Sequence, residues 1–550
     1  MDNIRRFITA VSLIILSAAA VKGQDRYAIH YKYKPQENFH LDEPTAFLSQ
    51  KAIDRRERNA VVLDSTDLPV SEQYIDAVKD IVINVQYNSK WMNASIVVAT
   101  DEQIAAVKKL PFVEEEGIEL IAKGFYTDNR EQRSNILNHP VRIRLLSKTK
   151  DEEDYAFQNN LIGIPKMHAE GLTGKGVTIA VFDGGFLNTD EIEGMKHLFD
   201  NNQIIATRDF VMPWSGNVFR SETHGTAALS LIASNDASTL VAGAYDAEYV
   251  LCITEDVASE YRIEEYNWVR AAEFADSLGV DIISSSLGYM TFNESSMDYK
   301  KSDLDGETAI ITQGATMAAD RGILVVNSAG NEGSNSETTI SAPADADGIL
   351  SVGAVNQGLT KASFSSVGPT ADGRIKPDVV ALGRSVRLWQ GANATTTASG
   401  TSFSAPQISA LAAGLWQGKP EWTKDELIHY IIQSSSQFKN PDNQLGYGIP
   451  DFELAYYGEI LDVVARPEVA NTKIYPNPTD GKELFIQFGS KEACEFTLFN
   501  QNGQVINQDQ LERSSNDVPY EVEIAKVNSG FYVVQLMEGL NIERHKIIIK

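Results

Sequence analysis

The stretch Val177-Thr178-Ile179-Ala180-Val181-Phe182-Asp183-Gly184-Gly185 decides the fold of this chain. Its first six residues form a nearly continuous apolar run, which is typical of a strand buried on both faces of a sheet. Helical stretches such as Tyr266–Leu278 and Gly306–Asp320 separate further runs of the same kind. The alternation predicts an α/β fold of three layers, a parallel sheet covered by helices on both faces. The other runs are Asp281–Ser284, Gly322–Val326 and Ile349–Val355.

The α/β pattern covers residues 155–460, and a different kind of sequence lies on each side of it. Residues 24–150 mix strand and helix signals and end in a charged patch, Lys148–Asp154, which predicts an exposed linker open to proteases. Residues 472–550 lack helix signals and carry short alternating strands, which predict a small all-β sandwich. These strands are Leu484–Phe488, Glu495–Asn500, Tyr520–Ile524, Phe531–Met537 and Glu543–Ile549.

The first 23 residues have the pattern of an export signal. Arg5 and Arg6 precede the apolar run Phe7–Ala20, and small residues before Gln24 suit a cleavage site. The run is shorter than the roughly 20 residues that span a bilayer, so we expect cleavage rather than a membrane anchor.

The composition of the chain argues against several classes of partner and site. The formal net charge is -27 over 550 residues, which argues against nucleic acid as a partner, because polyanions bind to positive surfaces. The two cysteines, Cys252 and Cys494, offer no disulfide framework and no cysteine zinc site, and we expect Cys252 to lie in the core.

Four polar residues stand at positions suited to catalysis, although each has an ordinary structural interpretation. Asp183 and Asn331 follow strands, where parallel sheets gather ligands, yet both also occur in turns beside glycine. His224 and Ser402 each precede an apolar helical stretch, and a helix N-terminus favours a developing anion. For Ser402 the alternative is a helix cap. Ser402 is thus a candidate nucleophile, and the side-chain amide of Asn331 is a candidate donor to an oxyanion.

The order Asp, His, Asn, Ser resembles that of the subtilisin-like serine proteases, peptidase family S8. The resembling segments are Val181–Gly185, Thr223–Ala228, Ser328–Gly333 and Gly400–Pro406. The resemblance implies a triad of Asp183, His224 and Ser402 with Asn331 in the oxyanion hole. It also implies that Ser284, Ser285, Ser286, Leu287 and Gly288 bind substrate and that Ser341 lies at the base of the specificity pocket.

Some positions depart from the family pattern without removing a catalytic group. Gly184 replaces the usual Ser or Thr after the aspartate, and Phe403 replaces the usual Met after the serine. Ala228 and Ser230 replace a valine and a glycine after the histidine. We expect Phe403 to alter the packing at the start of the helix after Ser402.

The flanking regions also resemble known modules. Residues 24–150 suit the prodomain of this family, and Asp54–Arg58 and Asp67–Ser71 resemble leader regions of secreted relatives from Bacteroidetes. A plain surface helix and loop is the alternative. The resemblance places maturation between about residue 120 and residue 160. Residues 472–550 resemble the type IX secretion sorting domain of Bacteroidetes, through Ile474–Pro478, Phe499–Gly503, Ser529–Tyr532 and Arg544–Lys550. A carbohydrate- or protein-binding sandwich is the alternative there.

The sequence therefore predicts a serine endopeptidase, made as a precursor and exported through the periplasm to the cell surface or beyond. Its expected partners are protein or peptide substrates and the type IX secretion machinery, and we expect a monomer. A catalytically inactive surface binding protein is the alternative, and a lipase is disfavoured because the Ser402 site lacks Gly-x-Ser-x-Gly. We expect no required cofactor. Calcium stabilises many members of the family, but no ligand loop can be assigned from this sequence.

Overall fold

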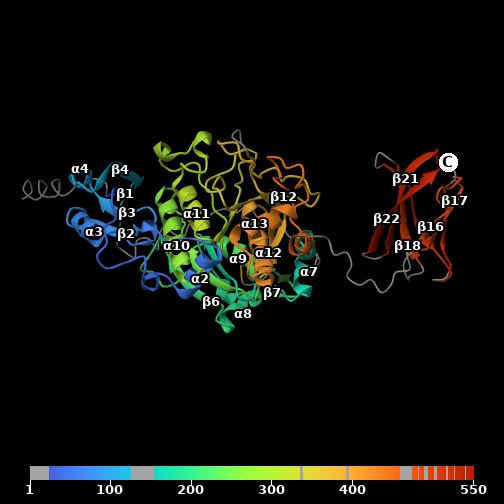
Figure 1. Ribbon diagram of the computed structural model, residues 1–550, viewed down its shortest axis with the longest axis horizontal. Helices are drawn as coiled ribbons and strands as arrows, with labels where there is room; N and C mark the ends of the chain where they lie inside the picture. Colours follow the sequence, from blue (N-terminus) through green and yellow to red (C-terminus); the bar gives the residue numbers. More distant parts are fainter. Residues whose placement is uncertain are drawn as a thin grey trace, which may run out of the picture. The chain divides into compact units, whose positions relative to one another are not determined.

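The computed structural model describes residues 24–124, 154–334, 339–391, 395–458 and, with short gaps, 473–550 (Figure 1). The chain divides into two compact units, residues 1–460 and 461–550. The predicted signal peptide and most of the predicted linker and maturation window lie outside the described residues. None of the helices in the described part is long and apolar enough to cross a membrane.

A seven-stranded parallel sheet forms the centre of the first unit, as predicted. Its order is β13-β12-β11-β10-β5-β9-β6, and β5 pairs with β10 on one side and β9 on the other. The strands are β5 (Thr178–Asp183), β6 (Ile204–Asp209), β9 (Glu248–Ile253), β10 (Ile282–Ser285), β11 (Leu324–Ser328), β12 (Leu350–Val355) and β13 (Val379–Leu382).

Helices cover both faces of this sheet because successive side chains of each strand point to opposite sides. Ile179 and Val181 of β5 pack in one cluster with the helices α9 and α12. Ala180 and Phe182, on the other face, pack with α10 and α11. The helices of the domain are α6 (Asp154–Leu161), α7 (Ile164–Ala169), α8 (Lys196–Asp200), α9 (His224–Ala233), α10 (Ile263–Leu278), α11 (Ile310–Asp320), α12 (Ala405–Gly418), α13 (Lys424–Gln433) and α14 (Phe452–Tyr457). The domain also contains short two-stranded sheets, in which β7 (Asn235–Asp236) pairs with β8 (Leu240–Val241) and β14 (Val386–Trp389) pairs with β15 (Thr395–Ala398).

Residues 24–124 form a four-stranded antiparallel sheet of order β2-β3-β1-β4. One face packs on α3 and α4. On the other face, Ala28, Ile96 and Ile121 cluster with Ile263 and Tyr266 of α10. The elements are β1 (Asp25–Tyr31), α2 (Gln50–Arg58), α3 (Glu72–Lys79), β2 (Asn84–Ser89), β3 (Ala94–Ala99), α4 (Asp101–Val107) and β4 (Val113–Ala122).

Helix α2 is not the surface helix that the sequence left open as an alternative. Arg55 and Arg56 are buried, and both donate hydrogen bonds to the carboxylate of Asp276 on α10. Lys51, one turn earlier, pairs with Asp281 just before β10. The helix thus contacts the end of the central sheet opposite to Asp183, because Asp281 precedes its strand whereas Asp183 ends one.

The second unit is the predicted sandwich. A three-stranded sheet, β16-β17-β20, and a four-stranded sheet, β19-β18-β21-β22, enclose one core. The sequence missed β19, whose burial pattern is almost wholly exposed and so lacks apolar alternation. The strands are β16 (Lys473–Tyr475), β17 (Glu483–Gln487), β18 (Ala493–Asn500), β19 (Val505–Glu512), β20 (Tyr520–Glu523), β21 (Gly530–Glu538) and β22 (Asn541–Ile549).

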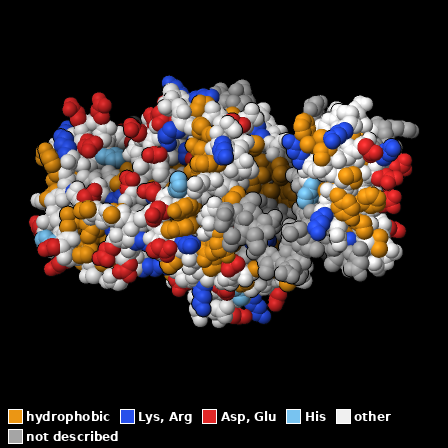
Figure 2. All heavy atoms as spheres, turned by 45° about the vertical axis from the view of Figure 1, so that its right-hand side comes forward, with side chains coloured by type: hydrophobic (Ala, Val, Ile, Leu, Met, Phe, Trp, Pro, Cys, Tyr) orange, Lys and Arg blue, Asp and Glu red, His pale blue; other side chains and the backbone are white. Residues whose placement is uncertain are grey.

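Acidic side chains are spread over the face shown in Figure 2 rather than gathered in one block. This agrees with the formal net charge of -27. Both cysteines are buried, as expected for Cys252.

Candidate active site

Asp183 and His224 meet at the carboxyl edge of the sheet. Asp183 ends β5 and is fully buried, and His224 is the first residue of α9. The ring Nδ1 lies 2.9 Å from Oδ2 and 3.0 Å from Oδ1 of the carboxylate. A carboxylate on Nδ1 leaves Nε2 as the nitrogen that can accept a proton.

Gly225 makes this close approach possible. A Cβ on Gly225 would lie 2.4 Å from the carbonyl oxygen of Gly185 and 2.8 Å from the Cβ of Asp183. Gly184, the departure beside the aspartate, is similarly enclosed, since a Cβ there would lie 2.8 Å from Val257 Cγ1. The side chain of Val257 therefore occupies the space that a Ser or Thr side chain at position 184 would need.

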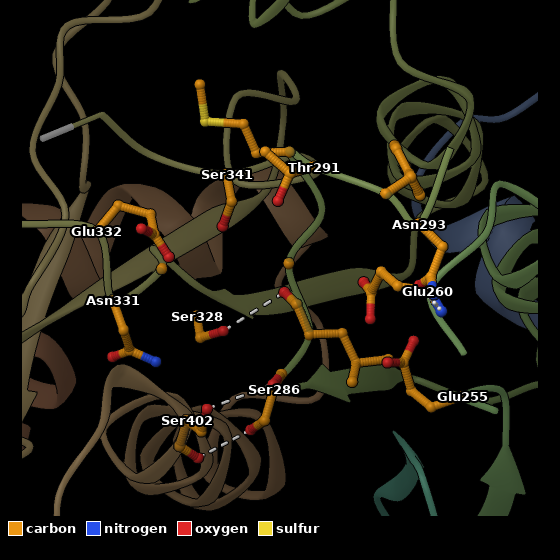
Figure 3. A pocket seen from close by; sticks show the side chains of 15 residues that line it. Glu255, Glu260, Ser286, Thr291, Asn293, Ser328, Asn331, Glu332, Ser341 and Ser402 are labelled. Atoms are coloured by element: carbon orange, nitrogen blue, oxygen red, sulfur yellow. Dashed lines mark hydrogen bonds between the residues drawn. The ribbon is translucent and has the colours of Figure 1, made fainter. Parts of the chain in front are cut away.

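Ser402 lies in a short 3₁₀ turn, Thr401–Phe403, directly before α12. Its backbone carbonyl accepts a hydrogen bond from the Ser286 hydroxyl at 2.8 Å, and its own hydroxyl donates to the Ser286 carbonyl at 3.4 Å (Figure 3). Among the hydrogen bonds of the described residues, none joins Ser402 to His224. The serine hydroxyl is therefore turned toward Ser286 rather than toward the imidazole.

Asn331 is held so that its amide NH₂ stays available. The side-chain oxygen accepts hydrogen bonds from the backbone N–H of Thr401 at 3.0 Å and from the Thr401 hydroxyl at 3.1 Å. A backbone N–H can only donate, so the oxygen must face Thr401 and the NH₂ group must face away from it. In Figure 3 the nitrogen points into the pocket above Ser402.

Phe403 packs against the catalytic histidine candidate. Its ring centroid lies 5.6 Å from that of His224, with the two rings tilted by 42°. The ring belongs to a cluster that includes Ala227 and Leu231 of α9. Phe403 therefore packs the turn that holds Ser402 against helix α9. Ser230, another departure, accepts a hydrogen bond from the backbone N–H of Trp389 at 3.1 Å.

Two opposing effects set the pKa of His224. Burial lowers this pKa. The charge and hydrogen bond of Asp183 and the charge of Glu222 together raise it by a larger amount, so the pKa lies above the ordinary value of 6.5. Such a shift favours the charged, protonated form of the imidazole.

A groove of about 990 Å³ contains Ser402 and Asn331. Ser286, Leu287, Gly288 and Ser341 also line it. The Ser341 hydroxyl fills the space beside two glycines, since a Cβ on Gly288 would lie 2.3 Å from it and one on Gly330 would lie 2.6 Å from it.

The side chains of Ser284 and Ser285 do not share this groove. They lie inside the domain, where Ser284 bonds to the hydroxyl of Ser409 and Ser285 accepts from the indole of Trp268. The structure thus brings Ser286, Leu287, Gly288 and Ser341 to the groove and leaves the other two predicted residues in the sheet.

Four glutamates at or behind the groove were missed by the sequence analysis. Glu255 and Glu260 line it, and Glu264 stands behind them in the first turn of α10. The signal was present for Glu255, which follows β9 as Asp183 ends β5. Glu332, next to Asn331, also lines the groove.

The fold and the site define a peptidase of the subtilisin type. A family model described as the subtilase family matches residues 174–448, and the chain belongs to this family. Residues 26–135 match a peptidase S8 propeptide domain of Bacteroidota, and residues 473–550 match a secretion system C-terminal sorting domain.

Curated relatives agree with the family match. The chain is 28% identical to subtilisin from Bacillus pumilus, over 54% of this chain and 96% of that protein. It is 30% identical to subtilisin DY from Bacillus licheniformis, over 55% and 94% of the two chains. It also aligns with the crystal structure of MycP1 from Mycobacterium smegmatis, with a TM-score of 0.45, 21% identity and coverage of 58% and 88%.

The predictions of family, fold and enzyme class are therefore confirmed. The chain is a serine endopeptidase with an N-terminal propeptide and a sorting domain of the type IX system. The sorting domain directs it to the cell surface or the extracellular space.

Proposed function

We propose that this endopeptidase hydrolyses peptide bonds through Ser402, His224 and Asp183 by way of an acyl-enzyme. The observation that carries the proposal is the Asp183–His224 pair, with Nδ1 and Oδ2 2.9 Å apart, at the edge of the sheet where Ser402 and Asn331 line a groove.

Each group has one role in the reaction. His224 takes the proton of the Ser402 hydroxyl as the oxygen attacks the substrate carbonyl, and Asp183 holds the ring and stabilises its charged form. The NH₂ group of Asn331 and the backbone N–H of Ser402 stabilise the oxyanion. His224 then protonates the leaving amine, and water hydrolyses the ester on Ser402.

The substrate in this proposal is an extended peptide beside Ser286, Leu287 and Gly288. Main-chain hydrogen bonds bind such a peptide without regard to its sequence. Ser341, at the base of the pocket, is neutral and so gives no strong preference for a charged side chain there. The enzyme acts as a monomer and needs no cofactor for the chemical step.

The propeptide and the linker complete the proposal. Residues 24–150 are removed from the enzyme domain, 155–460, by a cut between about residue 120 and residue 160, and residues 472–550 serve export. N-terminal sequencing of the active form locates the cut, and an active form that begins at residue 24 would exclude removal of a prodomain.

Labelling with a serine-directed fluorophosphonate tests the proposal. We expect the processed protein to carry the label on Ser402, and the Ser402→Ala variant to carry none and to cleave no peptide. Label on another serine, or unchanged proteolysis by Ser402→Ala, contradicts the assignment. A folded, processed wild type without label would support the alternative of an inactive binding protein.

A further inference from the structure

Three carboxylates converge at one end of the groove. Glu255 follows β9, Glu260 lies in the next loop and Glu264 stands in the first turn of α10. One carboxylate oxygen from each lies within 4.8 Å of those of the other two. Figure 3 shows Glu255 and Glu260 together on the side of the groove opposite Asn331.

The three groups are short of hydrogen-bond donors and cations. Glu264 is only 1% exposed. Its Oε1 accepts from the backbone N–H of Tyr261, but its Oε2 is buried without a partner, as is Oε1 of Glu255. Within the described part of the chain, no Lys or Arg forms an ion pair with any of the three. A buried carboxylate without a donor is costly, so this arrangement is incomplete as it stands.

The pKa values of the three glutamates are raised, which also indicates that their negative charges are not compensated. Burial raises the pKa of Glu260 to about 7. Burial, followed by the charges of neighbouring carboxylates, raises the pKa of Glu255 and of Glu264 above the ordinary range. A cation delivered between the groups removes this repulsion.

The cluster is continuous with the groove that holds Ser402. Among the described residues that line this groove, the charged ones are Glu255, Glu260 and Glu332, and none is basic. A cleft lined by one sign of charge attracts ligands of the opposite sign.

We propose that Glu255, Glu260 and Glu264 form a subsite for the side chain of a Lys or Arg residue of the peptide substrate. The proposal rests on the proposed function, because the peptide that fills this subsite is the one cleaved at Ser402. A peptide beside Leu287 and Gly288 carries its side chains along the groove wall, and Lys and Arg are long enough to reach a recessed carboxylate while Glu255 and Glu260 flank the stem.

A divalent metal fits the cluster less well. Calcium takes six to eight oxygen ligands and usually collects backbone carbonyls and waters around a loop. The described residues bring together three carboxylates, two of which face an open groove. A side-chain ammonium or guanidinium needs only a few acceptors, which matches this number.

The test is a positional-scanning library of quenched fluorescent peptides, cleaved by the mature form of the full-length protein. Within each enzyme, kcat/KM for a peptide with Lys or Arg at one position is divided by kcat/KM for the same peptide with Gln. We expect this ratio to exceed about 10 at one position upstream of the cleaved bond, in the range of close charge pairs.

Charge variants then assign the subsite. Glu255→Gln and Glu260→Gln should each reduce the ratio by roughly tenfold, and Glu260→Lys should bring it below 1, so that the Gln peptide is cleaved faster than the Lys or Arg peptide. Glu421→Gln, an exposed carboxylate outside the groove lining, should leave the ratio unchanged. High salt should lower the ratio in the wild type, because ions screen partly exposed charges.

Two results overturn the proposal. The first is that no position of the peptide shows a preference for Lys or Arg, or that the preference is the same in the Glu→Gln and Glu→Lys variants as in the wild type. The other is activity that a chelator removes and calcium restores in the wild type but not in Glu264→Gln, which makes the cluster a metal site. Fluorophosphonate labelling of Ser402 in the same samples separates these results from failure of the proposed function, since a labelled enzyme without the preference loses only the subsite.

Discussion

The guanidinium of Arg55 and the carboxylate of Asp276 form a fully buried ion pair, with Nη2 and Oδ1 2.5 Å apart, although one belongs to the propeptide and the other to the enzyme domain. Arg56 and Lys90 pair with the same carboxylate. Arg55 also donates to the backbone carbonyl of Val280 at 2.6 Å. The propeptide thus contacts the enzyme domain through a buried charge network as well as through its sheet.

Arg55→Ala should destabilise the precursor. Removing one partner of a buried pair costs about 3–5 kcal/mol when the other charge is left without compensation. Arg56 and Lys90 still pair with Asp276, so the expected loss here is that of the missing charged hydrogen bonds, about 1.5–3 kcal/mol. We expect a loss of that size in the free energy of unfolding, measured by denaturant in a Ser402→Ala background that cannot process itself. Glu57→Ala, an exposed neighbour on the same helix, should change it by less than about 0.5 kcal/mol. Equal stability of the two variants would show that the pair adds nothing.

The same network predicts acid sensitivity of the precursor. Burial alone raises the pKa of Asp276, but Lys90, Arg55 and Arg56 outweigh it and hold the pKa well below its usual range. A carboxyl with a depressed pKa stabilises the fold above its unfolded pKa of about 4 and loses that contribution as the pH falls. The Arg55→Ala deficit should therefore shrink below about pH 4, which the same denaturant titrations can follow.

Asn331→Ala should slow the chemical step. Loss of one oxyanion donor costs roughly 100- to 1000-fold in kcat, with a small change in KM, because the hydrogen bond forms in the transition state. Thr401→Val removes one of the two bonds that orient the amide and should cost less than Asn331→Ala. Steady-state kinetics on one peptide compare the variants, and a pure KM effect of Asn331→Ala would exclude the oxyanion role.

The acid limb of the pH profile should lie above pH 6.5. His224 accepts a proton only when neutral, and Asp183 and Glu222 raise its pKa above the ordinary 6.5 in spite of burial. Activity is thus lost as the pH falls through the raised pKa. Glu222→Gln removes one of the two charges and should move the limb of kcat/KM to lower pH, whereas Glu421→Gln should not. An unmoved limb would mean that another group controls it.

Gly225→Ala should reduce activity without unfolding the enzyme. The added Cβ has no room between the Gly185 carbonyl and Asp183, so α9 must shift away from the carboxylate. A misplacement of about 1 Å can cost ~100-fold in rate. Gly216→Ala is the matched control, since a Cβ there meets no atom within 4 Å. Both kcat/KM and circular dichroism should be measured, and equal activity of the two variants would refute the argument.

Deletion of residues 472–550 should stop export beyond the periplasm. The sorting domain has a hydrophobic core of its own. The truncated enzyme should therefore still fold and take the fluorophosphonate label in the periplasmic fraction. Normal appearance of the truncation in the medium would contradict the sorting role.

The order of apolar strands and helices was sufficient to predict the three-layer fold, because periodicity and burial are local properties of the chain. Asp183, His224, Asn331 and Ser402 could be named as candidates because each lies beside a strand end or a helix start, and their order along the chain supplied the resemblance to the family. The type IX sorting domain was recognisable from its turns and its last strand. The exposed strand β19 could not be found, because it lacks the alternation that marks a half-buried strand.

Only the tertiary structure decided which polar groups share a space. It divided the predicted substrate strand between the groove and the sheet interior, and it buried Arg55 against a carboxylate more than two hundred residues away. It also gathered Glu255, Glu260 and Glu264 at one end of the groove. A local sequence pattern carries no information on contacts between distant residues, since charge and burial at a site depend on chain segments that folding brings together.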